Sequence, residues 1–129
     1  MERAALQELL QLKKLRERGL RNRLSALAQR EATLNCERRE AHETRLRLRS
    51  ERDELFAEPP AVGPLAFRTL KMQLTRCYEE SRAASETSTQ IDTSLVLLNE
   101  ERNDTLLGLN RNAREQEKLS SLMEELDGY

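Results

Sequence analysis

The residues that could do chemistry in this chain are few, and their spacing does not match that of a catalytic or metal-binding site. His42 is the only histidine and lies among charged residues, so we interpret it as a solvated helix residue. Cys36 and Cys77 lack the close spacing of the cysteines that bind zinc. Adjacent glutamates such as Glu79 and Glu80 are typical of solvated helix faces. We therefore expect no catalytic residues, no cofactor and no metal.

The composition of the 129-residue chain explains why such a site is not expected. Charged residues make up 35% of the chain, aromatic residues make up 3%, and tryptophan is absent. So few bulky side chains cannot fill the centre of a thick globule, whereas this mixture is typical of long helices and coiled coils. Catalysis needs convergent groups in a pocket that excludes water. The composition therefore favours a binding protein over an enzyme.

One segment of the chain stands out as a break between helices. The sequence EPPAVGP, at positions 58–64, contains all three prolines. Consecutive prolines end a helix, and Pro64 suits the first turn of a new one. We predict one helix at about 2–57, a turn at 58–64 and a second helix at about 65–126. Because so short a connection favours antiparallel neighbours, we expect residues 1–129 to form a single all-α, antiparallel coiled-coil hairpin.

Apolar residues recur in steps of three and four along both predicted helices, which is the heptad pattern of a coiled coil. In the first helix they form one column from Leu6 to Leu55, and in the second they run from Phe67 to Leu126. We call the expected contact line between the helices the seam. Its expected apolar members are Leu20, Leu24, Leu27, Leu34, Leu48, Leu55, Ile91, Leu95, Leu98, Leu109, Leu119 and Leu126.

The second seam column of the first helix is mostly charged. It includes Arg38, Arg45 and Arg52, and we expect their aliphatic stems to cover apolar surface while their charged ends reach water. So polar a seam predicts marginal stability. If the turn is centred near Ala61, the numbers of paired residues add to about 122. This register would place Phe67 against the end of the first helix.

Charge is unevenly distributed along the chain, although its formal net value is −1. Positions 13–52 carry 13 basic and 6 acidic residues, and positions 65–129 carry 8 basic and 12 acidic residues. Helices that complement each other explain this pattern best, and a basic docking surface is the alternative. We expect no nucleic-acid partner. We also expect no signal peptide and no membrane insertion, and therefore a cytoplasmic protein with reduced cysteines.

Three regions are candidates for binding partners, and each also has a purely structural explanation. The first is the basic run at 13–23, in which Lys14, Arg18 and Arg21 share one outer helix stripe. The second is the turn end of the hairpin, where bulky residues could either close the hairpin or anchor a partner. The third is the pair of chain ends, where leucines outnumber what one seam can bury. The candidate partner-binding residues are Lys13, Lys14, Arg18, Arg21, Phe67, Leu70, Leu74 and Tyr78.

The order of these features resembles a known family. The chain opens with LLQLKKLRERGLRNRL at positions 9–24, breaks once at a proline-containing turn, and then runs in heptads to LSSLMEELDGY. It resembles the small stalk proteins of bacterial type III secretion, the YscO/HrpO (SctO) group, and in particular its HrpO branch. This group is similar to the flagellar protein FliJ. The polar seam of the first helix departs from the family pattern.

The resemblance implies a stalk at the centre of the hexameric export ATPase, with no chemistry of its own. The implied partners are the secretion ATPase, its stator or regulator protein, the export gate and secretion chaperones. The chain ends, at about 9–23 and 115–126, would enter the ATPase, and positions 67–78 would point toward the gate. The implied location is cytoplasmic, at the periphery of a membrane secretion apparatus.

A generic cytoplasmic coiled-coil scaffold or adaptor is the alternative function. Exposed apolar stripes would allow such a protein to form homo-oligomers, and the sequence leaves the oligomeric state open. Binding to a secretion ATPase distinguishes the two hypotheses.

Overall fold

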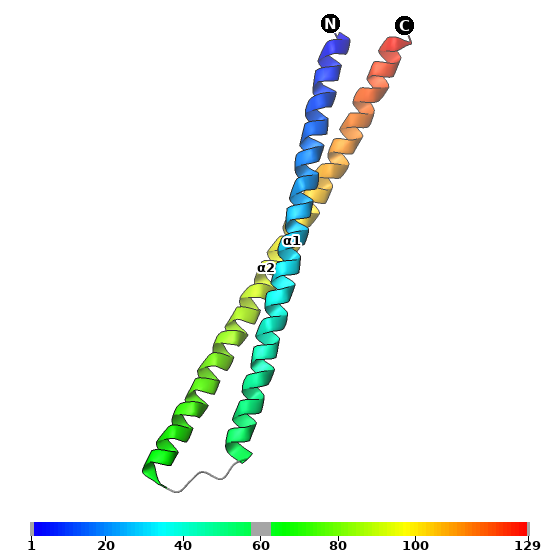
Figure 1. Ribbon diagram of the computed structural model, residues 1–129. Helices are drawn as coiled ribbons and strands as arrows, with labels where there is room; N and C mark the ends of the chain where they lie inside the picture. Colours follow the sequence, from blue (N-terminus) through cyan, green and yellow to red (C-terminus); the bar gives the residue numbers. More distant parts are fainter. Residues whose placement is uncertain (1, 58–62, 129) are drawn as a thin grey trace. The chain divides into compact units, whose positions relative to one another are not determined.

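The chain folds into two long helices, and its computed structural model describes residues 2–57 and 63–128. Helix α1 comprises Glu2–Ala57 and helix α2 comprises Pro64–Asp127. They pair antiparallel as an all-α helical hairpin (Figure 1), which confirms the predicted fold class. The helix ends lie within one residue of the predicted ones. Positions 58–62 of the predicted turn lie outside the described residues.

The local sequence explains where α2 begins and ends. Gly63 has a φ of 142°, a backbone conformation that would strain any residue with a β-carbon. Its carbonyl oxygen accepts a hydrogen bond from the Phe67 amide at 3.1 Å. Pro64 is thus the first helical residue, a position where its missing N–H removes no helical hydrogen bond. At the other end, the Gly128 amide donates to the Glu124 carbonyl at 3.0 Å and closes the last turn.

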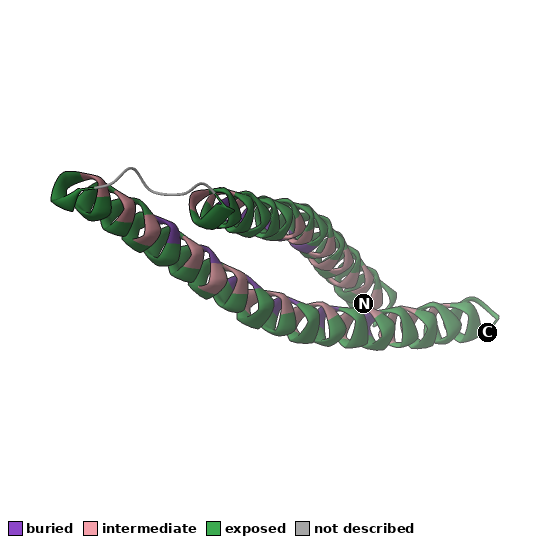
Figure 2. Ribbon diagram, turned by 90° about the horizontal axis from the view of Figure 1, so that it is seen from below, coloured by how far each residue is buried: buried purple, intermediate pink, exposed green. Residues whose placement is uncertain are grey.

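Contacts group the chain into two units. Unit 1 comprises Met1–Glu31 and Val96–Tyr129, and unit 2 comprises Ala32–Leu95. Both helices contribute to both units, so each unit is a stretch of paired helix. Figure 2 shows buried and intermediate residues along one side of each helix, with exposed residues over the rest of the surface.

Unit 2 has a thin apolar core with one buried residue from each helix in every heptad. The core residues follow one another at intervals of seven on both helices, as a coiled-coil seam requires. The alanines and the cysteine among them are small, so each layer buries little apolar area. The buried residues of unit 2 are Leu34, Ala41 and Leu48 from α1, and Cys77, Ala84 and Ile91 from α2.

Unit 1 has a more polar core. Leu27 and Leu98 are its buried apolar residues, with 8% and 5% of their surface exposed. The next positions of the same column in α2 are Thr105 and Asn112, which are also buried. The Thr105 hydroxyl is satisfied within its own helix, because it donates to the Glu101 carbonyl at 2.8 Å. Unit 1 therefore relies on polar contacts where unit 2 relies on apolar ones.

The register between the helices differs from the predicted one. The residue numbers of the interhelical ion pairs, such as Arg23–Glu101 and Glu51–Arg76, add to between 124 and 133 rather than to about 122. The first turn of α2 consequently extends past the end of α1. Phe67 has no described α1 residue opposite it and is 66% exposed, so its predicted place in the seam is wrong.

The other predicted seam residues lie close to the helix contact line, with one exception. Leu27, Leu34, Leu48, Ile91 and Leu98 are buried, and Leu20, Leu24, Leu55, Leu95, Leu109 and Leu119 are half-buried. The exception is Leu126, which is 39% exposed although it lines a groove with Ala5 and Leu6 of α1. It lies in the last turn of α2, where the register leaves only the first residues of α1 to cover it. Arg38, Arg45 and Arg52 are also exposed rather than in the seam.

Candidate interaction surfaces

The basic run at 13–23 divides into residues that bind within unit 1 and residues that face solvent. Lys13 is half-buried and forms an ion pair with Glu115 of α2. Arg21 donates from Nε and Nη2 to Oε1 of Glu17, at 3.1 and 2.8 Å. Lys14 and Arg18 are exposed, and neither has an ion-pair partner among residues 2–57 and 63–128. Together with Arg16, which is also exposed and has no ion pair among the described residues, these two residues are the part of the basic run that is free to bind a partner.

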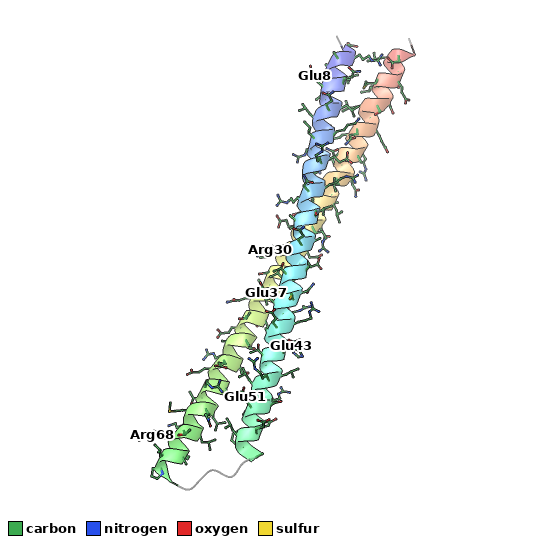
Figure 3. All side chains as sticks on the ribbon, in the orientation of Figure 1. Glu8, Arg30, Glu37, Glu43, Glu51 and Arg68 are labelled. Atoms are coloured by element: carbon green, nitrogen blue, oxygen red, sulfur yellow. The ribbon has the colours of Figure 1, made fainter. Side chains whose placement is uncertain are left out.

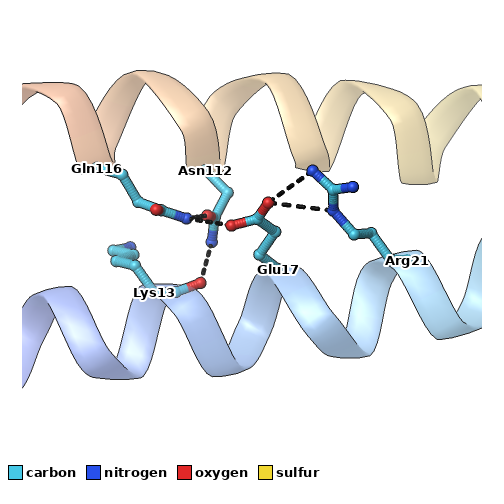
Figure 4. A network of polar contacts seen from close by, with 5 residues as sticks. All are labelled: Lys13, Glu17, Arg21, Asn112 and Gln116. Atoms are coloured by element: carbon cyan, nitrogen blue, oxygen red, sulfur yellow. Dashed lines mark hydrogen bonds and ion pairs between the residues drawn. The ribbon is translucent and has the colours of Figure 1, made fainter.

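A network of polar contacts crosses the seam of unit 1 (Figure 4). The Asn112 side-chain amide donates to the Lys13 carbonyl oxygen at 3.0 Å. Gln116 donates to Oε2 of Glu17 at 2.8 Å and to the side-chain oxygen of Asn112 at 2.6 Å. With Arg21 bound to the same Glu17 carboxylate, side chains from both helices form one connected set. The sequence places Asn112 and Gln116 at heptad positions, but their bonding partners depend on the register.

Asn112 is the best-buried member of this network, with 3% of its surface exposed. A buried amide that lost its partners would destabilise the fold by about 1–3 kcal/mol. In coiled coils, a single buried asparagine selects one register and one pairing for this reason. The network therefore favours the observed alignment of unit 1 over alignments shifted by a heptad.

The same contacts shift the acidity of two carboxyl groups. Hydrogen bonds from Gln116 and then Arg21 lower the pKa of Glu17. The Lys13 ammonium group, through its hydrogen bond and its charge, lowers the pKa of Glu115. Both carboxylates are therefore held in the ionised form that the interhelical contacts require.

Ion pairs between the helices follow the predicted charge complementarity. Four of those described have the basic residue on α1, and two have it on α2. Glu51 of α1, labelled in Figure 3, binds Arg76 of α2 at 3.1 Å. Since the partners are substantially exposed, each pair contributes only about 0–1 kcal/mol. The six pairs are Arg3–Asp127, Lys13–Glu115, Arg23–Glu101, Arg38–Asp92, Glu31–Arg102 and Glu51–Arg76.

The candidate residues at the turn end do not form one surface. Leu70 and Leu74 are half-buried on the side of α2 that faces α1. Phe67 and Tyr78 are 66% and 69% exposed. A partner could therefore reach the two aromatic rings, whereas the two leucines serve mainly to close the hairpin.

A groove that the sequence analysis did not identify lies in unit 2. We call it the arginine groove. It is bounded on α1 by His42, Arg45, Leu46, Leu48, Arg49 and Arg52, and on α2 by Cys77, Tyr78 and Ser81. Its basic residues recur at intervals of three and four, a spacing that could have revealed one helix stripe. The sequence analysis instead assigned two of these residues, Arg45 and Arg52, to the seam. Burial raises the pKa of the Cys77 thiol, so this cysteine is a poor nucleophile.

Exposed leucines gather in unit 1 near the chain ends. Leu9, Leu12 and Leu15 are 47%, 61% and 61% exposed, in accord with the expectation that leucines there exceed what the seam can bury. A second groove, which we call the terminal groove, lies close by in the same unit. It is lined by Glu2, Ala5, Leu6, Leu122, Glu125 and Leu126.

Comparisons with known proteins identified no family for this chain. The chain matched no protein-family model, no curated protein and no solved structure. Among the described residues, no helix is both long and apolar enough to cross a lipid bilayer. Those residues also contain no cluster of three or more side chains suited to hold a metal ion.

Proposed function

We propose that this chain is a docking protein of a bacterial type III secretion system. In this role it is a stalk or escort that binds the export ATPase and links it to the export gate, the stator protein or secretion chaperones. The sequence resemblance to the secretion stalk proteins suggests this system. The helical hairpin is compatible with the role, because long paired helices present extended surfaces and need no catalytic site.

One structural observation carries the docking part of the proposal. Lys14 and Arg18 are exposed on one stripe of α1 and have no carboxylate partner among the described residues. Leu12 and Leu15, each 61% exposed, lie beside them in the sequence. Basic and apolar side chains in one region suit an acidic partner surface with an apolar pocket, because the charges steer the encounter and the leucines supply contact area.

The experiment measures binding of the full chain to an isolated secretion ATPase. We expect Lys14→Glu combined with Arg18→Glu to weaken binding at least tenfold, which corresponds to about 1.4 kcal/mol. The matched control is Arg111→Glu combined with Arg114→Glu, which makes the same charge change on exposed positions of α2 in the same unit. Both double variants should keep the helix content of the original chain.

The outcomes separate the proposal from its alternative. Equal weakening by both double variants would mean that overall charge, and not this stripe, governs binding. Absence of ATPase binding at micromolar concentrations would favour the general scaffold or adaptor. That alternative is supported by a different surface, because Val96, Leu97 and Leu107 of α2 are 60%, 59% and 66% exposed and could receive another partner.

A further inference from the structure

The arginine groove of unit 2 combines an apolar floor with a basic rim. Leu48 and Cys77 form the floor and are only 2% and 3% exposed. Leu46 and Tyr78 stand at the edges, with 48% and 69% of their surfaces exposed. An occupant would therefore meet apolar surface at the centre of the groove and positive charge along its α1 side.

The positive charge of this groove is not neutralised within the described residues. Arg45 and Arg49 have no carboxylate within ion-pair distance there. Arg52 binds Asp53, its neighbour in the chain, at 3.3 Å. On the α2 side the groove is lined by a thiol and by the hydroxyl groups of Tyr78 and Ser81, with no carboxylate. The matching occupant is an acidic surface that also presents apolar side chains.

The chain carries a surface of that kind in unit 1. Leu122 and Leu126 in the terminal groove are 47% and 39% exposed. Glu2 and Glu125 line the same groove, and neither forms an ion pair among the described residues. Asp127, the next acidic residue, is already bound to Arg3. Two unpaired carboxylates are therefore flanked by two accessible leucines.

We propose that the arginine groove of one copy of the chain binds the terminal groove surface of a second copy. Glu2 and Glu125 supply the negative charges that would pair with Arg45 and Arg49, and the exposed leucines cover the apolar floor. The two surfaces differ, so the contact is heterologous, and a pair of copies keeps one free arginine groove and one free terminal groove. Assembly therefore continues beyond a dimer or closes into a ring.

The contact is small, so the association is weak and depends on charge. Each groove exposes only a few side chains, far less than the surface of a stable dimer. Ion pairs at such an exposed contact are screened as the ionic strength rises. We expect reversible self-association that increases with protein concentration and decreases on addition of salt.

The test is a charge-reversal pair followed by sedimentation. The first variant combines Arg45→Glu with Arg49→Glu, and the second combines Glu2→Lys with Glu125→Lys. At roughly 10–500 µM, the range in which small contacts assemble, the original chain should show an average mass that rises with concentration. Each variant alone should stay at the monomer mass. An equal mixture of the two should associate again, because the unchanged arginine groove of the second variant meets the unchanged terminal groove of the first, and the two reversed surfaces are also complementary.

The matched control combines Arg39→Glu with Arg47→Glu, which reverses two exposed arginines of the same helix outside the groove. It should associate as the original chain does. Helix content is checked by circular dichroism, and neutral Arg45→Gln with Arg49→Gln replaces a variant that fails to fold. The proposal is overturned if the original chain remains monomeric, if the control loses association equally, or if the mixture does not associate. The experiment uses no ATPase, so its result is independent of the proposed function.

Discussion

The seam of unit 1 can be tested with two neighbouring leucines of α2 that differ in burial. Leu98 is 5% exposed and lies at a heptad position, whereas Leu97 is 59% exposed. Replacing either one with aspartate removes the same side chain from the same helix and adds the same charge. Any difference between the two variants therefore reports the burial of Leu98.

The expected difference follows from the burial of the two side chains. Truncating a buried leucine costs about 2–5 kcal/mol, and an aspartate at this position adds the cost of taking a carboxylate out of water. At Leu97 the main cost is the lower helix propensity of aspartate, about 0.7 kcal/mol. The free energy of unfolding should therefore fall by at least about 3 kcal/mol more for Leu98→Asp than for Leu97→Asp.

Thermal unfolding followed by circular dichroism measures this difference. At about 4 °C for each kcal/mol, the midpoint for Leu98→Asp should lie at least about 12 °C below that for Leu97→Asp. The helix signal of Leu98→Asp could also be lost before heating begins, since such a seam has little stability to lose. Equal midpoints for the two variants would refute the burial of Leu98 in the seam described above.

Three further predictions follow from individual side chains. Asn112→Leu should raise the free energy of unfolding by about 1 kcal/mol, because burial of the apolar side chain stabilises the fold more than the lost hydrogen bonds did. Urea titration measures this change, and a decrease would contradict the expected balance. Folding lowers the pKa values of Glu17 and Glu115. The stability that these two ionised carboxylates contribute is therefore fully present above their ordinary pKa, about 4.3, and is lost as the pH falls through the lowered values. Urea titrations across this range should show the loss, Glu17→Gln should reduce it, and a pH-independent stability would argue against these contacts. Exposed Cys36 should react quickly with a thiol reagent while buried Cys77 reacts only after denaturation, and equal rates by mass spectrometry would show that Cys77 is not buried.

The ends of the helices could be predicted from the sequence because backbone chemistry determines them locally. Pro64 cannot occupy a helix interior but fits its first turn, and Gly63 takes a φ that other residues avoid. Heptad spacing similarly identified Leu34, Leu48, Ile91 and Leu98, since burial along a coiled coil depends on periodicity.

The register and the arginine groove could not be predicted in the same way. The register depends on which side chains meet across the seam. It was predicted from the centre of the turn alone, and that estimate takes no account of contacts such as the hydrogen bond between Asn112 and Lys13. The groove is formed by residues of both helices, and the sequence analysis had assigned two of them, Arg45 and Arg52, to the seam. The half-buried positions of α1 near them are Thr44 and Glu51, each one residue earlier in the chain.

The buried asparagine of unit 1 has a consequence for how the chain finds its correct partner segment. If α2 slipped by one heptad, Asn112 and Gln116 would face leucines of α1 in place of Lys13 and Glu17, and Gln116 would lose the carboxylate that accepts its hydrogen bond. Misaligned hairpins are thus penalised more strongly than the correct one is rewarded. A helix pair can in this way combine low stability with a single alignment, because fidelity depends on the free-energy gap between alignments and not on how deep the best one lies.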